Sequence, residues 1–550
     1  MMQKFSRLLA VFITVAVTFT PLIARSAAAQ EKSDKAAEPS AEKAAAKAPP
    51  QEVTTQGAVD AGGQHISYNA VAGIITVGAT DVQDAQLGPD GKPQPDTDLA
   101  AAVEAAKNPA DAPPLARMFY VAYFKQGANA NRPITFLYNG GPGSSTVWLH
   151  MGSFGPKRVD TDDQDTHLPA APYKLEDNPY SLLDVSDLVF IDMPGTGFGR
   201  LTGKDSDKAF WGVDQDGHAF ARFIQRFLSK YNRWNSPKYL FGESYGTTRS
   251  AVLSNMLEND YNIDLNGVML LSQIFNFTTD IDEAHTNPGV DMPYELALPT
   301  YAATALYHHK LPQDHPDLEA FMQEVETFAM GPYAQALDKG TDLSATEKQA
   351  IAEKLHDYTG LPVDYLVKGD LRISGPQFEH TLIGDDTTTG RLDTRFSGPS
   401  INPLGEESEY DPQSSAISSA YVSLFNQYVR QTLKYGASET YLPEAQFHGF
   451  EWQFMRHGDP ILNVAPDLAM AMKTNDKLKV MVNGGYYDLA TPFYAAFYED
   501  KHLPIPDRLA GNIEYQWYQS GHMVYVRNSA LKQLHDRVAA FIKSTEAGNE

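Results

Sequence analysis

Four short apolar runs limit the possible folds of this chain more than any other feature of its sequence. They are ITFLY from Ile134, DLVFID from Asp187, KYLFG from Lys238 and NGVMLLS from Asn266. Uninterrupted apolar runs of this length are typical of parallel strands that helices cover on both faces. A segment ahead of the third run has apolar side chains at helical spacing, namely Phe220, Phe223, Ile224, Phe227, Leu228 and Tyr231. We therefore expect an α/β fold with a mostly parallel central sheet and an amphipathic crossover helix.

Further strands are predicted on either side of these runs. Residues 63–79 and 116–126 are rich in β-branched and aromatic side chains and predict N-terminal antiparallel strands. Much later in the chain, residues 478–483 and 513–519 predict two more strands of the same sheet.

A long interruption separates the two parts of this predicted core. Residues 281–470 are longer than an ordinary crossover and mostly helical in composition, so we expect them to form a largely helical lid insertion. The α/β core is then expected at residues 53–280 and 471–550.

Composition excludes several classes of function. The chain has 550 residues, 42% of them hydrophobic, which predicts a sizeable buried core. Its formal net charge of −25 would repel phosphate backbones and anionic membranes, so we expect no nucleic-acid partner. Because the sequence contains no cysteine, disulfides, thiolate catalysis and Cys-ligated zinc are excluded.

The first residues have the composition of a cleavable secretory signal. Residues 1–29 combine early basic residues, an apolar stretch over residues 8–24 and small residues Ala27 and Ala29 at the expected cleavage site. The alternative is an uncleaved membrane anchor, but the stretch is short for a span and is interrupted by Pro21.

Residues 30–52 contain only Ala, Pro, Ser, Gln and charged residues and predict a disordered linker. No later segment has the length and apolarity of a membrane helix. The sequence therefore predicts an exported protein, periplasmic or extracellular, with no stable membrane span after signal cleavage.

A serine between two glycines follows the third apolar run. The stretch YLFGESYGTT, Tyr239 to Thr248, contains the spacing Gly-x-Ser-x-Gly, which is a weak signal by itself. Its context is more specific, because a predicted strand precedes it and a run that can be helical follows it. Gly242 and Gly246 would permit the sharp turn of a nucleophile elbow, with Ser244 at the carboxyl edge of the sheet. We expect Ser244 to be the nucleophile.

Two further residues complete this chemistry. Asp488 directly follows one predicted strand and His522 directly follows the next, so both belong at the same sheet edge as Ser244. The order Ser, Asp, His is that of an α/β-hydrolase triad. Histidine can accept the serine proton near neutral pH, and aspartate can orient its ring. An ordinary loop histidine and a turn aspartate are the alternatives, and the shared edge favours the triad.

Five stretches together resemble the motif blocks of one family, the serine carboxypeptidases, and the chain is identified as a bacterial-type secreted member. They are FLYNGGPGSSTVWLHMGSFGP, NPYSLLDVSDLVFIDMPGTGFG, FGESYG, GGYYDLATP and SGHMVY. The resemblance implies an α/β-hydrolase fold, a cofactor-free mechanism and peptide substrates with a free C-terminus. It also implies roles for particular residues: Ser244, Asp488 and His522 as the triad, the backbone N–H groups of Gly141 and Tyr245 as the oxyanion hole, and Asn139, Gly140 and Glu243 as the site for the substrate carboxylate.

The residue chemistry agrees with these implied roles. A glycine-rich loop after a strand leaves its N–H groups free to stabilise an oxyanion. An ionised Glu243 beside the nucleophile would repel a substrate carboxylate, so its protonated form is expected to bind that group. This predicts peptidase activity that is favoured by acid.

Three positions depart from the family pattern. Ser144 stands where the family usually has Cys, and Leu137 where it commonly has Trp. Ser153 stands where the family has a second glutamate, two residues before the Gly-Pro. Because serine cannot share a proton with Glu243 as a glutamate can, exopeptidase specificity is less strongly implied than hydrolysis.

The function expected from the sequence is a serine-type carboxypeptidase that cleaves the C-terminal peptide bond through an acyl-enzyme on Ser244. Alternatives on the same triad are an esterase or acyltransferase and a proline iminopeptidase, which usually has His in place of Asn139. A non-catalytic hydrolase-fold binding protein is the alternative from another class. The acidic run from Asp160 to Asp165 lacks the pattern of a calcium loop, and the pair His308 and His309 has no matching ligands, so no metal and no cofactor are predicted. The sequence does not predict an oligomeric state.

Overall fold

The computed structural model describes residues 52–161, 163–384, 386–445 and 449–547. These lie in one compact unit, Pro49–Glu550. The predicted signal at residues 1–29, and all of the predicted linker except its last residue, fall outside the described residues.

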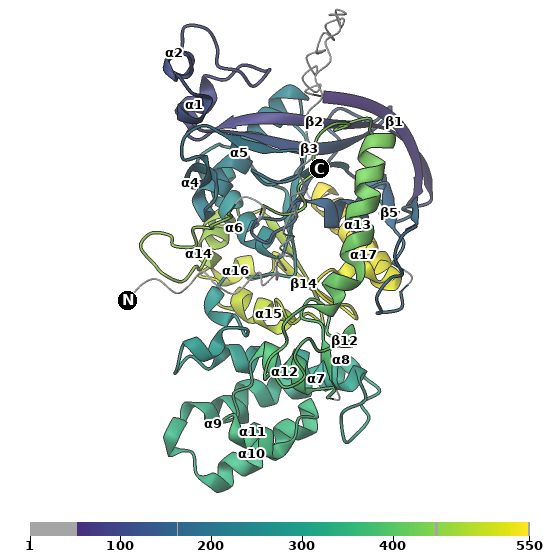
Figure 1. The fold of residues 1–550 in the computed structure, drawn as a ribbon, viewed down its shortest axis with the longest axis vertical. Helices are drawn as coiled ribbons and strands as arrows, with labels where there is room; N and C mark the ends of the chain where they lie inside the picture. Colours follow the sequence, from purple (N-terminus) through teal and green to yellow (C-terminus); the bar gives the residue numbers. More distant parts are fainter. Residues whose placement is uncertain (1–51, 162, 385, 446–448, 548–550) are drawn as a thin grey trace, which may run out of the picture. The chain divides into compact units, whose positions relative to one another are not determined.

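A large mixed sheet forms the centre of the unit (Figure 1). In spatial order its strands are β1 (Glu52–Ala61), β2 (Gln64–Gly78), β3 (Leu115–Lys125), β7 (Asp187–Ile191), β4 (Ile134–Tyr138), β9 (Lys238–Glu243), β10 (Gly267–Leu271), β13 (Lys479–Gly485) and β14 (Ile513–Tyr518), with β8 (Arg200–Thr202) paired to β3. From β7 to β14 neighbouring strands run parallel, whereas β1, β2, β3 and β7 pair antiparallel. All eight predicted strands are present.

The apolar runs form buried strands because successive side chains enter two different cores. Tyr239 and Phe241 of β9 face a core shared with α13 (Pro412–Gln431) and α17 (Asn528–Ala547). Leu240 of the same strand faces a core shared with α5 (Val213–Lys230), α6 (Tyr245–Asn259) and α14 (Ala465–Thr474). Helices therefore cover both faces of the sheet, as Figure 1 shows. This is the predicted α/β-hydrolase fold, and α5 is the predicted crossover helix.

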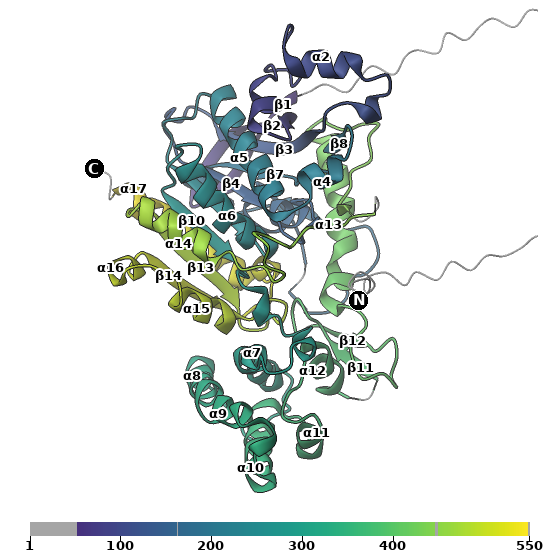
Figure 2. The ribbon, with the colours of Figure 1, turned by 90° about the vertical axis from the view of Figure 1, so that its left-hand side faces the viewer.

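A group of helices follows β10, seen below the sheet in Figure 2, and builds a third core that also includes Tyr486, Tyr487, Leu489 and Phe493. Its members are α7 (Met292–Tyr307), α8 (Leu318–Phe328), α9 (Ala334–Asp338), α10 (Ala345–Thr359), α11 (Val363–Lys368) and α12 (Gly375–Thr381). The rest of residues 281–470 is different, because α13 and α14 pack on the two faces of the sheet. The interval expected to be one lid thus contains a helical insertion and two covering helices of the core.

Several small elements complete the chain. The remaining strands are β5 (Lys157–Val159), β6 (Leu175–Asp177), β11 (Thr387–Thr389) and β12 (Ser397–Pro399). The remaining α-helices are α1 (Asp81–Ala85), α2 (Asp98–Ala105), α3 (Val147–Leu149), α4 (Ser206–Phe210), α15 (Phe493–Lys501) and α16 (Asp507–Ala510). In the part of the chain that the structure describes, no helix is both long enough and apolar enough to cross a membrane.

Candidate active site

Ser244 lies at a sharp turn between β9 and α6. Its backbone has φ 61° and ψ −130°, a conformation that is strained for any residue with a side chain. The neighbouring glycines make this turn possible: a Cβ on Gly242 would lie 2.2 Å from the carbonyl oxygen of Gly246, and a Cβ on Gly246 would lie 2.8 Å from that of Tyr138. The turn holds the partly exposed Ser244 side chain at the carboxyl end of the parallel strands.

Asp488 and His522 come from the loops after β13 and β14 and form a buried pair. The Nδ1 of His522 lies 2.9 Å from Oδ2 of Asp488. Thr491 holds the same carboxylate twice, because its N–H donates to Oδ1 at 3.0 Å and its hydroxyl donates to Oδ2 at 2.7 Å. The carboxylate is therefore fixed with one oxygen directed at the imidazole, which leaves Nε2 as the free ring nitrogen.

The electrostatics of His522 reflect two opposing effects. Burial alone would lower its pKa, but the charges of Asp488 and Glu243 outweigh burial and raise the pKa above the ordinary value. No hydrogen bond joins the Ser244 hydroxyl to the imidazole within the described residues. Such contacts are often long in ligand-free enzymes and tighten when substrate binds.

Residues 391–393, which sequence reasoning did not single out, hold the loops of Asp488 and His522 by hydrogen bonds. The N–H of His522 donates to the carbonyl of Leu392 at 2.6 Å, and the N–H of Gly521 donates to Asp393 at 3.1 Å. The Asp488 loop is bonded to the same segment, since Leu489 donates to the carbonyl of Arg391 at 3.1 Å. Residues 391–393 therefore link the aspartate loop to the histidine loop. Only the folded structure brings them together, so no local pattern indicates this role.

The glycine-rich loop after β4 packs directly on the serine turn. A Cβ on Gly140 would lie 2.4 Å from the amide nitrogen of Tyr245 and 2.7 Å from the carbonyl oxygen of Glu243, so only glycine fits there. Gly141 has φ 107°, which also favours glycine. Neither the amide of Gly141 nor that of Tyr245 donates a hydrogen bond to another described residue. Both donors are available for an oxyanion.

Glu243 is the residue before the serine, and its side chain is buried. Burial raises its pKa to about 7, although nearby His522 and the side chains of Tyr525 and Asn139 each lower it. A substantial fraction of this carboxyl is therefore protonated near neutral pH, in line with the protonated state expected from the sequence.

Asn139 lies beside Glu243 at the end of β4 and is held firmly. Its Oδ1 accepts from the N–H of Leu149 at 2.9 Å, and its carbonyl accepts from Arg249 at 2.8 Å. Because the amide oxygen is already used, the side-chain NH₂ group is the part that can donate to a ligand.

The positions that depart from the family pattern have structural partners of their own. The Ser153 hydroxyl donates to the carbonyl of Leu149 at 2.6 Å, so it is bonded within its own helical turn. The Ser144 hydroxyl donates to Glu444 at 3.1 Å and accepts from the indole N–H of Trp148 at 2.8 Å. Ser144 thereby ties the glycine-rich loop to a segment that lies 300 residues later in the chain.

Tyr525 is a residue beside Glu243 that sequence reasoning missed. Its hydroxyl lies next to Glu243 and Asn139, and its ring is fully buried. Neither this hydroxyl nor Oε2 of Glu243 has a hydrogen-bond partner among the residues that the structure describes. The ring fits because residue 152 is glycine, whose Cβ would otherwise lie 2.5 Å from Cδ2 of Tyr525. The signal was in the sequence, since Tyr525 ends the SGHMVY block that also contains His522.

These residues form one site at the carboxyl edge of the sheet. A strained serine, a buried carboxylate–imidazole pair and two free amides are the parts that nucleophilic acyl transfer requires. Within the described residues, no group of three or more His, Asp or Glu side chains could hold a metal ion. The fold and this arrangement define the chain as an α/β-hydrolase.

Comparison with known protein families finds a similarity over part of the chain. The model of the serine carboxypeptidase family matches residues 110–368, a segment that contains the glycine-rich loop and Ser244. Asp488 and His522 lie beyond the matched segment, so their assignment depends on the geometry described above. The matched segment, just under half of the chain, is similar to the serine carboxypeptidases.

Three curated relatives are similar over shorter segments. The pheromone-processing carboxypeptidase KEX1 of Ogataea parapolymorpha is 31% identical over 26% of this chain and 22% of its own length. The carboxypeptidase Y homolog of Arthroderma benhamiae is 29% identical over 32% of this chain and 33% of its own. The serine carboxypeptidase-like 28 protein of Arabidopsis thaliana is 26% identical over 32% and 36%, respectively. The chain therefore spans only about a third or less of each relative that it matches.

A solved structure is also similar. The prohormone-processing carboxypeptidase Kex1(Δ)p of Saccharomyces cerevisiae aligns with 87% of this chain and 91% of its own at 14% identity, with a TM-score of 0.49.

Proposed function

We propose that this protein is a serine carboxypeptidase that removes the C-terminal residue from peptides through an acyl-enzyme on Ser244. The observation that carries this proposal is the position of Glu243, a buried and readily protonated carboxyl directly beside the strained serine. The Asp488–His522 pair supports hydrolysis, and Glu243 supports recognition of a free carboxylate.

The proposed reaction has two steps. The Ser244 hydroxyl attacks the carbonyl carbon of the last peptide bond, and its proton moves to Nε2 of His522 while the amides of Gly141 and Tyr245 stabilise the oxyanion. His522 then donates this proton to the leaving amine, and the C-terminal amino acid departs. Water then gives a proton to His522 and attacks the resulting ester. The bond between the acyl carbon and the Ser244 oxygen breaks, His522 returns the proton to that oxygen, and the shortened peptide leaves with a free carboxyl group.

The raised pKa values of two groups set the expected pH dependence. His522 must be neutral to act as a base, so activity falls as the pH drops below its raised pKa. Glu243 must be protonated to donate to a carboxylate, so substrate recognition fades as the pH rises through about 7. The active form therefore combines a neutral His522 with a protonated Glu243, and Glu243 determines its alkaline limit.

Glu243→Gln should flatten the alkaline fall of kcat/KM for peptide substrates, because glutamine keeps an N–H donor but cannot ionise. Esters that have no free carboxylate do not use this contact, and their hydrolysis should change little. The measurement is a pH–rate profile for one peptide and one ester with each protein.

Glu258→Gln is the matched control for this experiment. Burial also raises the pKa of Glu258 to about 7, but this residue lies at the far end of α6 and bonds to Leu265 and Asn475. Its replacement should leave both profiles unchanged. An alkaline limb that survives in Glu243→Gln would show that another group controls carboxylate recognition.

Tyr525→Phe should raise KM for free-acid peptides roughly tenfold while kcat changes little, because a hydrogen bond to a charged carboxylate is lost. We infer that the Tyr525 hydroxyl provides the donor that Ser153, bonded to its own turn, does not. Tyr428→Phe also removes a buried hydroxyl, one that lies 3.1 Å from that of Tyr123, and should leave the ratio of peptide to ester hydrolysis unchanged. Equal losses on peptide and ester in Tyr525→Phe would indicate a purely structural role.

We further propose that the protein is a bacterial-type, exported member of its family, in the periplasm or outside the cell. The composition of residues 1–29 supports export. The helices α7 to α12 of the insertion are proposed to act as a lid over the site, which their position in the chain between the Ser244 and Asp488 segments favours.

A further inference from the structure

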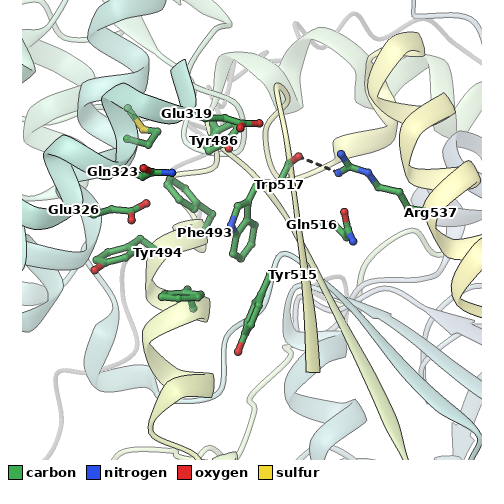
Figure 3. A pocket seen from close by; sticks show the side chains of 12 residues that line it. Glu319, Gln323, Glu326, Tyr486, Phe493, Tyr494, Tyr515, Gln516, Trp517 and Arg537 are labelled. Carbon is green, nitrogen blue, oxygen red and sulfur yellow. Dashed lines mark hydrogen bonds between the residues drawn. The ribbon is translucent and has the colours of Figure 1, made fainter. Parts of the chain in front are cut away.

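A cavity of about 340 Å³ lies away from the triad, where α8 of the helical insertion meets α15 and the edge strand β14 (Figure 3). None of the triad residues lines it. Tyr486 and Phe493, which do line it, flank the turn that carries Asp488. The cavity therefore borders the back of the aspartate loop.

Aromatic rings make up much of its wall. The ring centroids of Phe493 and Trp517 are 5.4 Å apart, and those of Phe497 and Tyr515 are 5.0 Å apart, both in edge-to-face arrangements. Tyr494 continues the row, 6.0 Å from Phe497. The faces of aromatic rings carry the negative part of their π systems and attract cations.

An acidic group on α8 faces these rings. Figure 3 shows the Glu326 side chain directed from α8 toward Phe493 and Tyr494. In the described part of the chain, Glu326 makes no hydrogen bond or ion pair, and its burial raises the pKa to about 7. Glu319, near the start of the same helix, lines the same cavity. A carboxylate that is desolvated and has no partner leaves a site for positive charge open.

Two basic residues border this cavity, and each already has partners: Arg537 lines it, and Lys501 contacts two of its rings. Lys501 lies with its Nζ 5.0 Å from the ring centre of Phe497 and 5.4 Å from that of Tyr515, which shows that these rings accept an ammonium group. Arg537 donates to the carbonyl of Trp517 at 3.2 Å, and its guanidinium lies over the ring of Tyr518. Neither neutralises Glu326.

We propose that this cavity binds a small organic cation, held by its ammonium group between the aromatic rings and the carboxylates of Glu326 and Glu319. Its volume is in the range of small-molecule sites. The rings supply a cation–π surface, and the carboxylates supply the opposite charge. The site is separate from the proposed active site and does not depend on the proposed carboxypeptidase activity.

Calorimetric titration of the full chain with choline tests this proposal, with 3,3-dimethylbutan-1-ol as an uncharged probe of nearly the same shape. We expect choline to bind at least roughly tenfold more tightly than the alcohol. Glu326→Gln should weaken choline binding by roughly tenfold, because it removes the charge and keeps the shape. Tyr494→Leu should weaken choline binding as well, through the loss of a ring face.

Glu353→Gln is the matched control, since Glu353 is an exposed glutamate of the same insertion that bonds to Gln349 on its own helix. It should bind choline like the unmodified protein. The pH dependence of binding is a second readout. Choline affinity should increase between roughly pH 6 and pH 8, because Glu326 ionises over this range. The titratable and charged groups around Glu326 are Glu319, Tyr486, Tyr494, Tyr515, Lys501 and Arg537. Equal binding of choline and the alcohol, no binding of choline, or equal effects of Glu326→Gln and Glu353→Gln would overturn the proposal.

Discussion

Ser244→Ala is expected to lower kcat for peptide hydrolysis by roughly 10⁶-fold, the scale of loss seen when a triad nucleophile is removed. The serine occupies a turn with φ 61°, which the two neighbouring glycines accommodate, and its side chain is partly exposed. Alanine retains the same backbone geometry, so the fold should be preserved. Only the oxyanion donors and substrate binding would remain to accelerate the reaction.

Labelling with a serine-directed phosphonate tests whether Ser244 is the nucleophile without measuring turnover. The phosphonate should label the unmodified protein once and leave Ser244→Ala unlabelled. His522→Ala should lose nearly as much kcat as Ser244→Ala, and the double variant little more, because the two side chains act as a unit. Labelling of a different serine, or losses that add in the double variant, would contradict the assignment.

Asp488→Asn is expected to lower kcat by roughly 10⁴-fold while the structure stays intact. Thr491 fixes the orientation of the new side chain: its N–H must face the amide oxygen, which places the amide NH₂ where Oδ2 now lies 2.9 Å from Nδ1 of His522. A donor at this position forces Nδ1 to accept, so Nε2 carries the proton and cannot take one from Ser244. The pH profile should change too, because the carboxylate that raises the pKa of His522 is lost.

Thr491→Val is the control for this variant. It removes one of the two hydrogen bonds that hold Asp488 but keeps the carboxylate, so we expect a loss of about tenfold or less. Comparable losses in Asp488→Asn and Thr491→Val would show that Asp488 contributes to the position of the loop rather than to the state of His522.

The sequence was sufficient to predict the central part of this fold because its strands are short, uninterrupted and buried on both faces. Successive side chains of the run KYLF in β9 face two different cores. Because both faces of the strand are buried, its sequence is continuously hydrophobic and can be recognised without the structure. The edge strand β1 was not predicted, because its sequence EVTTQGAVDA is polar, contains glycine and becomes a strand only by pairing with β2.

The candidate site also has residues that the sequence predicts and residues that it does not. Ser244, Asp488 and His522 each directly follow a strand, so their common location at one sheet edge could be inferred from strand order alone. The bracing segment 391–393 could not, because its contacts join loops that are distant in the chain. Tyr525 also depended on tertiary structure, since its position beside Glu243 requires a glycine at residue 152 in another part of the fold.

Cleavage of paired peptides by the purified protein is the most direct test of the proposed carboxypeptidase function. One peptide has a free C-terminal carboxylate and the other has a C-terminal amide. Mass spectrometry would follow the products between roughly pH 4 and pH 8, a range that brackets the ordinary pKa values of Glu and His. We predict that the free acid loses single residues from its C-terminus, that the amide is cut far more slowly, and that this difference shrinks as the pH rises through the pKa of Glu243, about 7. Equal cleavage of both peptides at acidic pH, or cleavage only at internal bonds, would contradict the assignment as a carboxypeptidase.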